Sequence, residues 1–161
     1  MRALFGISNS LGSARQMILA AAVFMAAASA ARAQDDSMIV PGVSMAGVHL
    51  GITDVELYRL LGDPKSTQTN GNISMNYDYS RFQVSVAIDT HKVIQVTTED
   101  PSYSTAEGIK VGSSGLAVAA KLGTPPGPCQ GGCDYTYPNG LALGIKEDGS
   151  VRAIWIFAPD S

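Results

Sequence analysis

The sequence contains few basic residues, and this shortage excludes two classes of partner. Residues 34–161 hold 8 Lys and Arg against 14 Asp and Glu, which gives a net charge of −6. Proteins that bind nucleic acid or an anionic membrane surface carry clustered positive charge. We therefore expect no nucleic-acid partner and no attraction to a membrane surface.

Histidine and catalytic motifs are equally scarce. The two histidines, His49 and His91, have no carboxylate at a spacing typical of a metal site, so we interpret both as surface residues. The chain has no Gly-x-Ser-x-Gly elbow and no Ser, His and Asp set on elements expected to converge. These absences predict a protein that is not an enzyme and has no catalytic residue, no metal and no cofactor.

Residues 1–33 contain no acidic residue, and their pattern is typical of a secretory signal peptide. A polar start with Arg2 and Arg15 is followed by an apolar run over 17–28 and by Ala-Arg-Ala at 31–33, which predicts cleavage after Ala33. The run is shorter than the roughly 20 apolar residues of a membrane span, so we expect no membrane insertion after cleavage. No cysteine stands at the cleavage point for lipid attachment. We therefore expect a periplasmic or secreted protein.

The remaining chain contains an internal repeat. After an N-terminal segment, 34–45, we expect a single domain over 46–161 made of two repeats, 46–100 and 107–157. Residues 47–64 read GVHLGITDVELYRLLGDP, and residues 108–125 read GIKVGSSGLAVAAKLGTP. At a constant offset of 61, five pairs are identical: Gly47 and Gly108, Gly51 and Gly112, Leu61 and Leu122, Gly62 and Gly123, Pro64 and Pro125.

Each repeat is expected to begin with a short helix. Thr53 followed by Glu56 forms a capping box, in which each side chain bonds the backbone N–H of the other residue. Gly62 and Pro64 end the helix, which predicts a helix over 54–61. In the second repeat Ser114, Gly123 and Pro125 take these positions.

Strands are expected after each helix. Apolar and polar residues alternate over 73–79 and 82–88, and further strands are predicted at 93–98, 134–137, 141–145 and 151–157. Each repeat is then a short helix followed by an antiparallel β-meander. The simplest way to join two such units is edge to edge, as an α+β fold in which one sheet carries both helices on one face.

The glycine-flanked opening of each repeat, the capped helix, the Leu-Gly-x-Pro stop and the closing hairpin resemble the tandem-repeat fold of the β-lactamase inhibitor proteins. A single copy of a similar unit occurs in small outer-membrane assembly lipoproteins. The resemblance covers residues 46–157 and implies the two-repeat α+β fold, with inhibition of a β-lactamase as one partner activity among many. This chain departs from the inhibitor family, which has a disulfide in each repeat, and from the lipoproteins, which need an N-terminal cysteine.

The two cysteines, Cys129 and Cys133, lie in one short loop after the second helix. In an oxidising compartment we expect them to form a disulfide. The loop that the bond closes is short, so its stabilising effect is only about 2 kcal/mol in the chain-entropy model. A redox pair and a copper site are the alternatives.

Aromatic residues are the candidates for partner binding. Four tyrosines occupy equivalent strand positions in the two repeats, and two further aromatics alternate on the last strand: Tyr77, Tyr79, Tyr135, Tyr137, Trp155 and Phe157. Exposed aromatic clusters on an open sheet are common anchors of protein interfaces. In the alternative arrangement the tyrosines pack in the core and residues 38–45 cover Trp155.

The sequence therefore predicts a non-enzymatic binding module whose helix-free sheet face holds another protein or an envelope component. One alternative is a structural accessory factor of an envelope assembly. A second is a small thiol or metal-handling protein that uses Cys129, Cys133 and a histidine.

Overall fold

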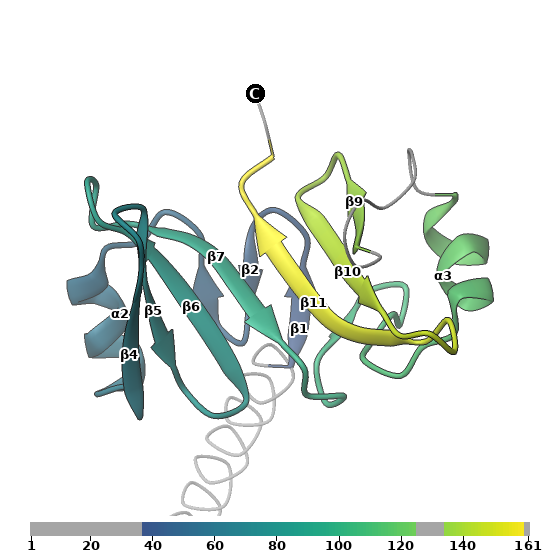
Figure 1. Ribbon diagram of the computed structural model, residues 1–161, viewed down its shortest axis with the longest axis horizontal. Helices are drawn as coiled ribbons and strands as arrows, with labels where there is room; N and C mark the ends of the chain where they lie inside the picture. Colours follow the sequence, from purple (N-terminus) through teal and green to yellow (C-terminus); the bar gives the residue numbers. More distant parts are fainter. Residues whose placement is uncertain (1–36, 125–133, 160–161) are drawn as a thin grey trace, which may run out of the picture. The chain divides into compact units, whose positions relative to one another are not determined.

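The computed structural model describes residues 37–124 and 134–159, which form an α+β fold (Figure 1). These residues contain two helices and two β-sheets, and most of the ordered structure is strand. The α+β class predicted from the sequence is confirmed. Cys129, Cys133 and the predicted signal peptide, 1–33, lie outside the described residues.

Helix α2 (Asp54–Leu61) begins and ends where the sequence predicts. The backbone N–H of Thr53 donates to Glu56 Oε2 at 2.8 Å, and the backbone N–H of Glu56 donates to Thr53 Oγ1 at 3.2 Å. The predicted capping box is therefore confirmed. The helix ends at Gly62. Its Leu57 side chain points into the core and has no exposed surface.

Helix α3 (Gly115–Leu122) has a simpler cap. Ser114 Oγ accepts a hydrogen bond from the backbone N–H of Ala117 at 3.2 Å, and the helix ends at Gly123. Val118 is the buried residue of this helix, in the position that Leu57 occupies in α2. Each helix is thus fixed at its ends by local hydrogen bonds and held in place by one buried side chain.

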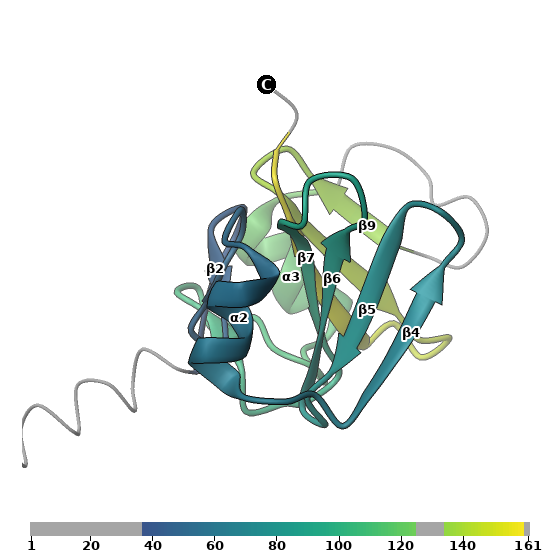
Figure 2. The same ribbon diagram turned by 90° about the vertical axis from the view of Figure 1, so that its left-hand side faces the viewer.

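The large sheet has seven strands in the order β4-β5-β6-β7-β11-β10-β9, and every neighbouring pair is antiparallel. Strands β7 and β11 meet in the middle, so the segment after α2 and the segment after α3 share one sheet (Figures 1 and 2). The strands are β4 (Ser66–Asn70), β5 (Ser74–Asp78), β6 (Phe82–Ala87), β7 (Val93–Thr98), β9 (Asp134–Tyr137), β10 (Leu141–Ile145) and β11 (Val151–Phe157).

A second, four-stranded sheet corrects the prediction of a single sheet. Its order is β3-β2-β1-β8, with β1 (Met38–Val40), β2 (Ser44–Met45), β3 (Val48–His49) and β8 (Ser104–Thr105). Ile39 of β1 pairs in parallel with Thr105 of β8, far away in the sequence. Strands of two or three residues are too short to show a period of two, which is why the sequence pattern missed this small sheet.

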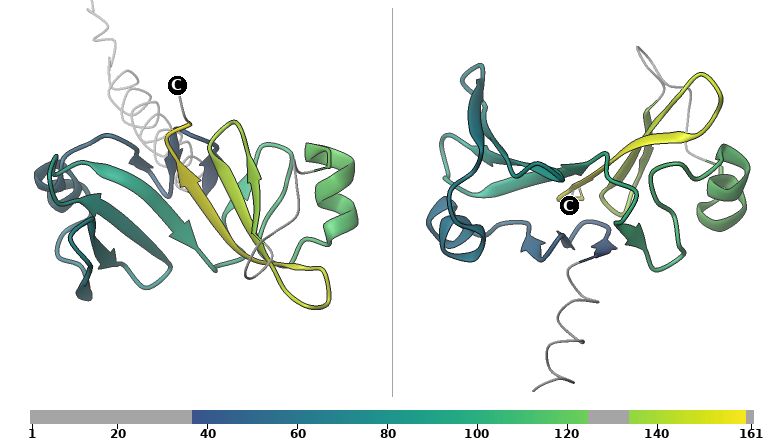
Figure 3. Two further views of the ribbon diagram at one scale, coloured as in Figure 1. Left: turned by 45° about the horizontal axis from the view of Figure 1, so that its top comes forward. Right: turned by 90° about the horizontal axis from the view of Figure 1, so that it is seen from below.

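The core lies on one face of the large sheet. Directly opposed residues on neighbouring strands share a face. One such row crosses six strands through Tyr77, Val84, Val96, Ile156, Leu141 and Tyr137, and all six side chains are buried. Leu57 of α2, Val118 of α3, and Ile39 and Met45 of the small sheet belong to the same core (Figure 3). Both helices and the small sheet therefore pack against this face.

Candidate binding site on the free sheet face

The opposite face of the large sheet, called the free face below, carries no covering helix or sheet in the part of the chain that the structure describes (Figure 3). Two rows of directly opposed residues run across it. The Trp155 row contains Asp78, Gln83, Thr97, Trp155, Ala142 and Thr136. The Phe157 row contains Gln68, Asn76, Ser85, Gln95 and Phe157.

The indole ring of Trp155 packs against Gly144 of β10, which has no side chain to exclude it. A Cβ atom added at Gly144 would lie 2.8 Å from Cη2 of the indole ring. The guanidinium carbon of Arg152 lies 5.8 Å from the ring centroid, in the range of a cation–π contact. Trp155 remains partly exposed, so the ring is held in place and still accessible from the free face.

A pocket of about 510 Å³ opens beside this tryptophan. Gln83 and Thr97 of the Trp155 row line it, and Thr97 is the direct neighbour of Trp155 on the adjacent strand. Its walls come from the β5–β6 turn and from the segment after β7. The lining residues are Asp78, Ser80, Arg81, Phe82, Gln83, Thr97, Glu99, Asp100 and Pro101.

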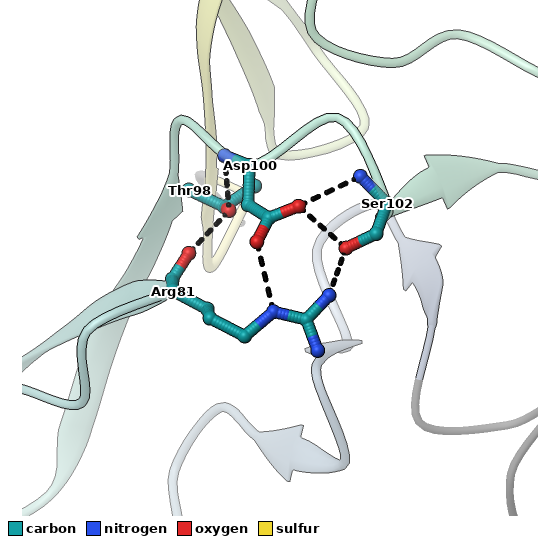
Figure 4. Close-up of polar contacts among 4 residues, drawn as sticks. All are labelled: Arg81, Thr98, Asp100 and Ser102. Carbon is teal, nitrogen blue, oxygen red and sulfur yellow. Dashed lines mark hydrogen bonds and ion pairs between the residues drawn. The ribbon is translucent and has the colours of Figure 1, made fainter.

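One wall of the pocket is fixed by a hydrogen-bond network (Figure 4). Asp100 accepts a bond from Arg81 Nε at 2.8 Å, and bonds from the backbone N–H and the Oγ of Ser102 at 2.9 and 2.6 Å. Arg81 also donates to Ser102 Oγ, and its guanidinium lies 5.0 Å from the ring centroid of Tyr103. Thr98 Oγ1 donates to the backbone carbonyl of Arg81 at 2.7 Å and accepts from the backbone N–H of Asp100. The network ties the β5–β6 turn to the segment after β7.

This network changes the acidity of Asp100. The hydrogen bond from Arg81, with those from Ser102, holds the pKa of the Asp100 carboxyl well below its usual range. Folding therefore weakens proton binding at Asp100. The stability that this group contributes is fully present above its ordinary pKa of about 3.9 and is lost as the pH falls through the folded-state value.

Asp100→Asn should destabilise the protein at neutral pH, and the difference from the wild type should shrink as the pH falls below about 4. Urea unfolding of both proteins at pH 7 and at pH 3 measures this difference. Other carboxylates titrate equally in the two proteins, so they cancel. A difference that is the same at both pH values would contradict the role assigned to Asp100.

The six aromatic candidates do not form one surface. Tyr77 and Tyr137 are only 5% and 7% exposed, on the core face. Tyr79 and Tyr135 are partly buried against the same core. Trp155 and Phe157 lie on the free face, partly exposed. Residues 38–45 form β1 and β2, which pack on the core face and do not cover Trp155.

Two of the tyrosines bond to helix ends. Tyr79 Oη donates to the carbonyl of Gly62 at 3.3 Å, and Tyr137 Oη donates to the carbonyl of Gly123 at 3.5 Å. Burial raises the pKa of Tyr79 to about 12, so its hydroxyl stays protonated and remains a donor. These tyrosines therefore attach each helix to the sheet.

Sequence reasoning missed the polar residues of the pocket. Asp78, Gln83 and Thr97 come from three different strands, Glu99 follows the last of them, and these residues carry no common motif. Within one strand, alternation with apolar residues indicates that a polar residue lies on the outer face. Which polar residues of different strands become neighbours depends on the register between the strands.

Over 37–124 and 134–159, no three His, Cys, Asp or Glu side chains are close enough to hold a metal ion. In these ranges no helix has the length and apolar character of a membrane span. His91 lies in the β6–β7 turn, and its Nδ1 is 3.1 Å from Oδ2 of Asp54. It borders a smaller, mostly apolar depression of about 200 Å³ beside α2.

Comparison by sequence assigns no relative to this chain. No known family matches it, and no curated protein is significantly similar.

Three of the solved structures that are similar to this chain have low sequence identity to it. An extracellular protein containing an SCP domain from Bacillus anthracis strain Ames is 9% identical, with a TM-score of 0.46. A cysteine-rich secretory protein from Staphylococcus aureus subsp. aureus Mu50 is 10% identical, with a TM-score of 0.49. Each comparison covers 68% of this chain and only 44% of the other, so the chain spans less than half of these proteins. A DUF4309 family protein from Bacillus subtilis subsp. subtilis strain 168 is 15% identical over 66% of this chain and 78% of its own, with a TM-score of 0.46.

Proposed function

We propose that this protein is a non-enzymatic binding module that holds another protein or an envelope component on its free face. The observation that carries this proposal is the one-sided arrangement of the large sheet. Both helices and the small sheet pack on one face, while Trp155 and Phe157 lie partly exposed on the other beside a pocket. Partly exposed aromatic side chains beside a pocket are common anchors of protein–protein interfaces.

We also propose that the two halves are copies of one helix-and-meander unit, as in the tandem-repeat family that the sequence resembles. Equivalent hydrogen bonds support this. The N–H of Gly51 donates to Val93 O at 2.7 Å, and the N–H of Gly112 donates to Val151 O at 2.8 Å. The bonds from Tyr79 to Gly62 and from Tyr137 to Gly123 are a second matched pair.

The compartment in this proposal is the periplasm or the extracellular space, because residues 1–33 have the pattern of a cleaved signal peptide. A structural accessory factor of an envelope assembly is the alternative role. It predicts that the protein is retained in a complex through surfaces other than the free face, so the same experiment separates the two roles.

The test is Trp155→Ala, studied by crosslinking in intact cells. Trp155 lies on the free face and is partly exposed, so we expect its loss to abolish capture of the partner while lowering the Tm by less than about 5 °C. Since Trp155 is the only tryptophan, iodide quenching of its fluorescence measures its accessibility directly.

Leu116→Ala is the matched control for this experiment. Leu116 is a large apolar side chain on α3 that is 85% exposed, and α3 packs on the other face of the sheet. We expect full capture with this variant. Unchanged capture by Trp155→Ala, or equal loss in both variants, would contradict binding through the free face.

A further inference from the structure

The charges around the pocket do not balance. Asp78, Glu99 and Asp100 line it together with a single cation, Arg81. Arg81 is already paired with Asp100 at 2.8 Å and bonded to Ser102. In the described parts of the chain, no cation pairs with Asp78 or with Glu99. Two carboxylates therefore keep their charge uncompensated beside the pocket.

Both of these carboxylates are accessible to a partner. Glu99 is exposed at the rim of the pocket. Asp78 belongs to the Trp155 row, and its Oδ1 accepts one hydrogen bond, from the backbone N–H of Ser80 at 2.7 Å. Its second oxygen has no bonding partner within the described residues.

The guanidinium of Arg152 lies on the side of Trp155 that faces away from the pocket. β11 runs between β7, whose Thr97 lines the pocket, and β10, which contains Gly144. An added Cβ at Gly144 would lie 2.9 Å from Nε of Arg152, so this guanidinium sits over β10. The Asp78 and Glu99 carboxylates therefore lie on the β6–β7 side of Trp155, and the Arg152 guanidinium lies on the β10 side.

We infer that the occupant of the free face is a basic, extended segment of a partner protein, with a lysine or arginine side chain in the pocket and its neighbouring residues across Trp155. The inference rests on the proposed function and names the chemistry of the partner. The pocket is large enough for a long cationic side chain, and Gln83 and Thr97 in its lining supply polar groups. The net charge of −6 over residues 34–161 speeds the encounter with a basic partner.

The probe is a short peptide that alternates lysine and glycine, with a glutamate and glycine peptide for comparison. Titration of the purified protein, followed by amide and indole NMR signals, should show binding of the lysine peptide alone. The largest shifts should fall on Gln83, Thr97 and the Trp155 indole. Raising the ionic strength to about 0.15 M should weaken the binding, because salt screens exposed charges.

The decisive variant is Asp78→Asn combined with Glu99→Gln, which removes both charges with little change of shape. We expect its affinity for the lysine peptide to fall about tenfold or more. The matched control is Asp89→Asn combined with Glu107→Gln, in the β6–β7 turn and in the loop between β8 and α3. The control also removes two negative charges, but from exposed positions outside the pocket. Its affinity for the lysine peptide should therefore change less than about twofold.

Equal weakening in both double variants would overturn the inference, because the attraction would then come from net charge alone. Binding of a neutral chitooligosaccharide at Trp155, with no binding of the lysine peptide, would overturn it in favour of a sugar site. If Trp155→Ala abolishes partner capture in cells and Asp78→Asn with Glu99→Gln leaves it intact, the proposed function stands and this inference fails.

Discussion

Replacing Leu57 by alanine should lower the free energy of unfolding by about 2 to 5 kcal/mol. Leu57 has no exposed surface and is the residue through which α2 enters the core. The substitution removes its packing against the sheet and leaves a cavity between the helix and the strands, which the surrounding side chains fill only in part. Urea unfolding at neutral pH measures this loss directly.

Leu116→Ala provides the control for this prediction as well. Leu116 is 85% exposed on the equivalent helix, so the same chemical change should alter the stability by less than about 0.5 kcal/mol. A Leu57→Ala protein as stable as the wild type would show that α2 is not anchored by this side chain.

Replacing Gly140 by alanine should lower the free energy of unfolding by about 3 kcal/mol or more. Gly140 has a φ of +81°, a conformation that costs a residue with a Cβ about 1 to 2 kcal/mol. The added Cβ would also clash with the backbone carbonyl of Phe157 and lie 2.7 Å from Cα of Gly42. These are backbone atoms that cannot rotate away, so overpacking adds a further cost of about 1 to 3 kcal/mol.

Gly149→Ala separates the two causes. Gly149 has nearly the same φ, +79°, and no atom lies within 4 Å of an added Cβ. We expect this variant to lose only the conformational part, about 1 to 2 kcal/mol. Equal losses for Gly140→Ala and Gly149→Ala would show that the close approach of Gly140 to Gly42 and Phe157 adds nothing.

The helices could be predicted from the sequence because their ends depend on neighbouring residues. Thr53 and Glu56 are three positions apart, and their reciprocal bonds form as soon as the first turn does. The helix ends at Gly62, whose backbone N–H donates to the carbonyl of Tyr58, one turn earlier. The α+β class follows from such local signals combined with the alternation of the strands.

Strands without an apolar alternation escaped the same reasoning. Strand β4 reads Ser-Thr-Gln-Thr-Asn and is exposed along its whole length. It pairs with β5, but it has no apolar residues whose alternation could predict a strand. Strand β1 depends on β8, a partner more than sixty residues later. Pairing of this kind is decided by contacts that form only when the chain is folded.

The aromatic residues show the limit of reasoning from periodicity. Alternation groups Tyr77 with Tyr79 and Trp155 with Phe157, and the structure keeps these groups on common faces. Ile154, Trp155, Ile156 and Phe157 make both faces of β11 apolar, so the pattern does not indicate which face the helices cover. The strand register decides it, by aligning Ile156 with the buried Val96 and Trp155 with Thr97.

The sequence by itself determined the local elements: the capped ends of α2 and α3, and the positions of six of the seven strands of the large sheet. These features depend on residues a few positions apart, whose interactions are the same in any fold that contains them. The tertiary structure alone decided the small sheet, the covered face and the pocket beside Trp155. The physical reason is that the pocket exists only where the register sets Gln83 opposite Thr97 and Thr97 opposite Trp155, on strands that are distant in the sequence.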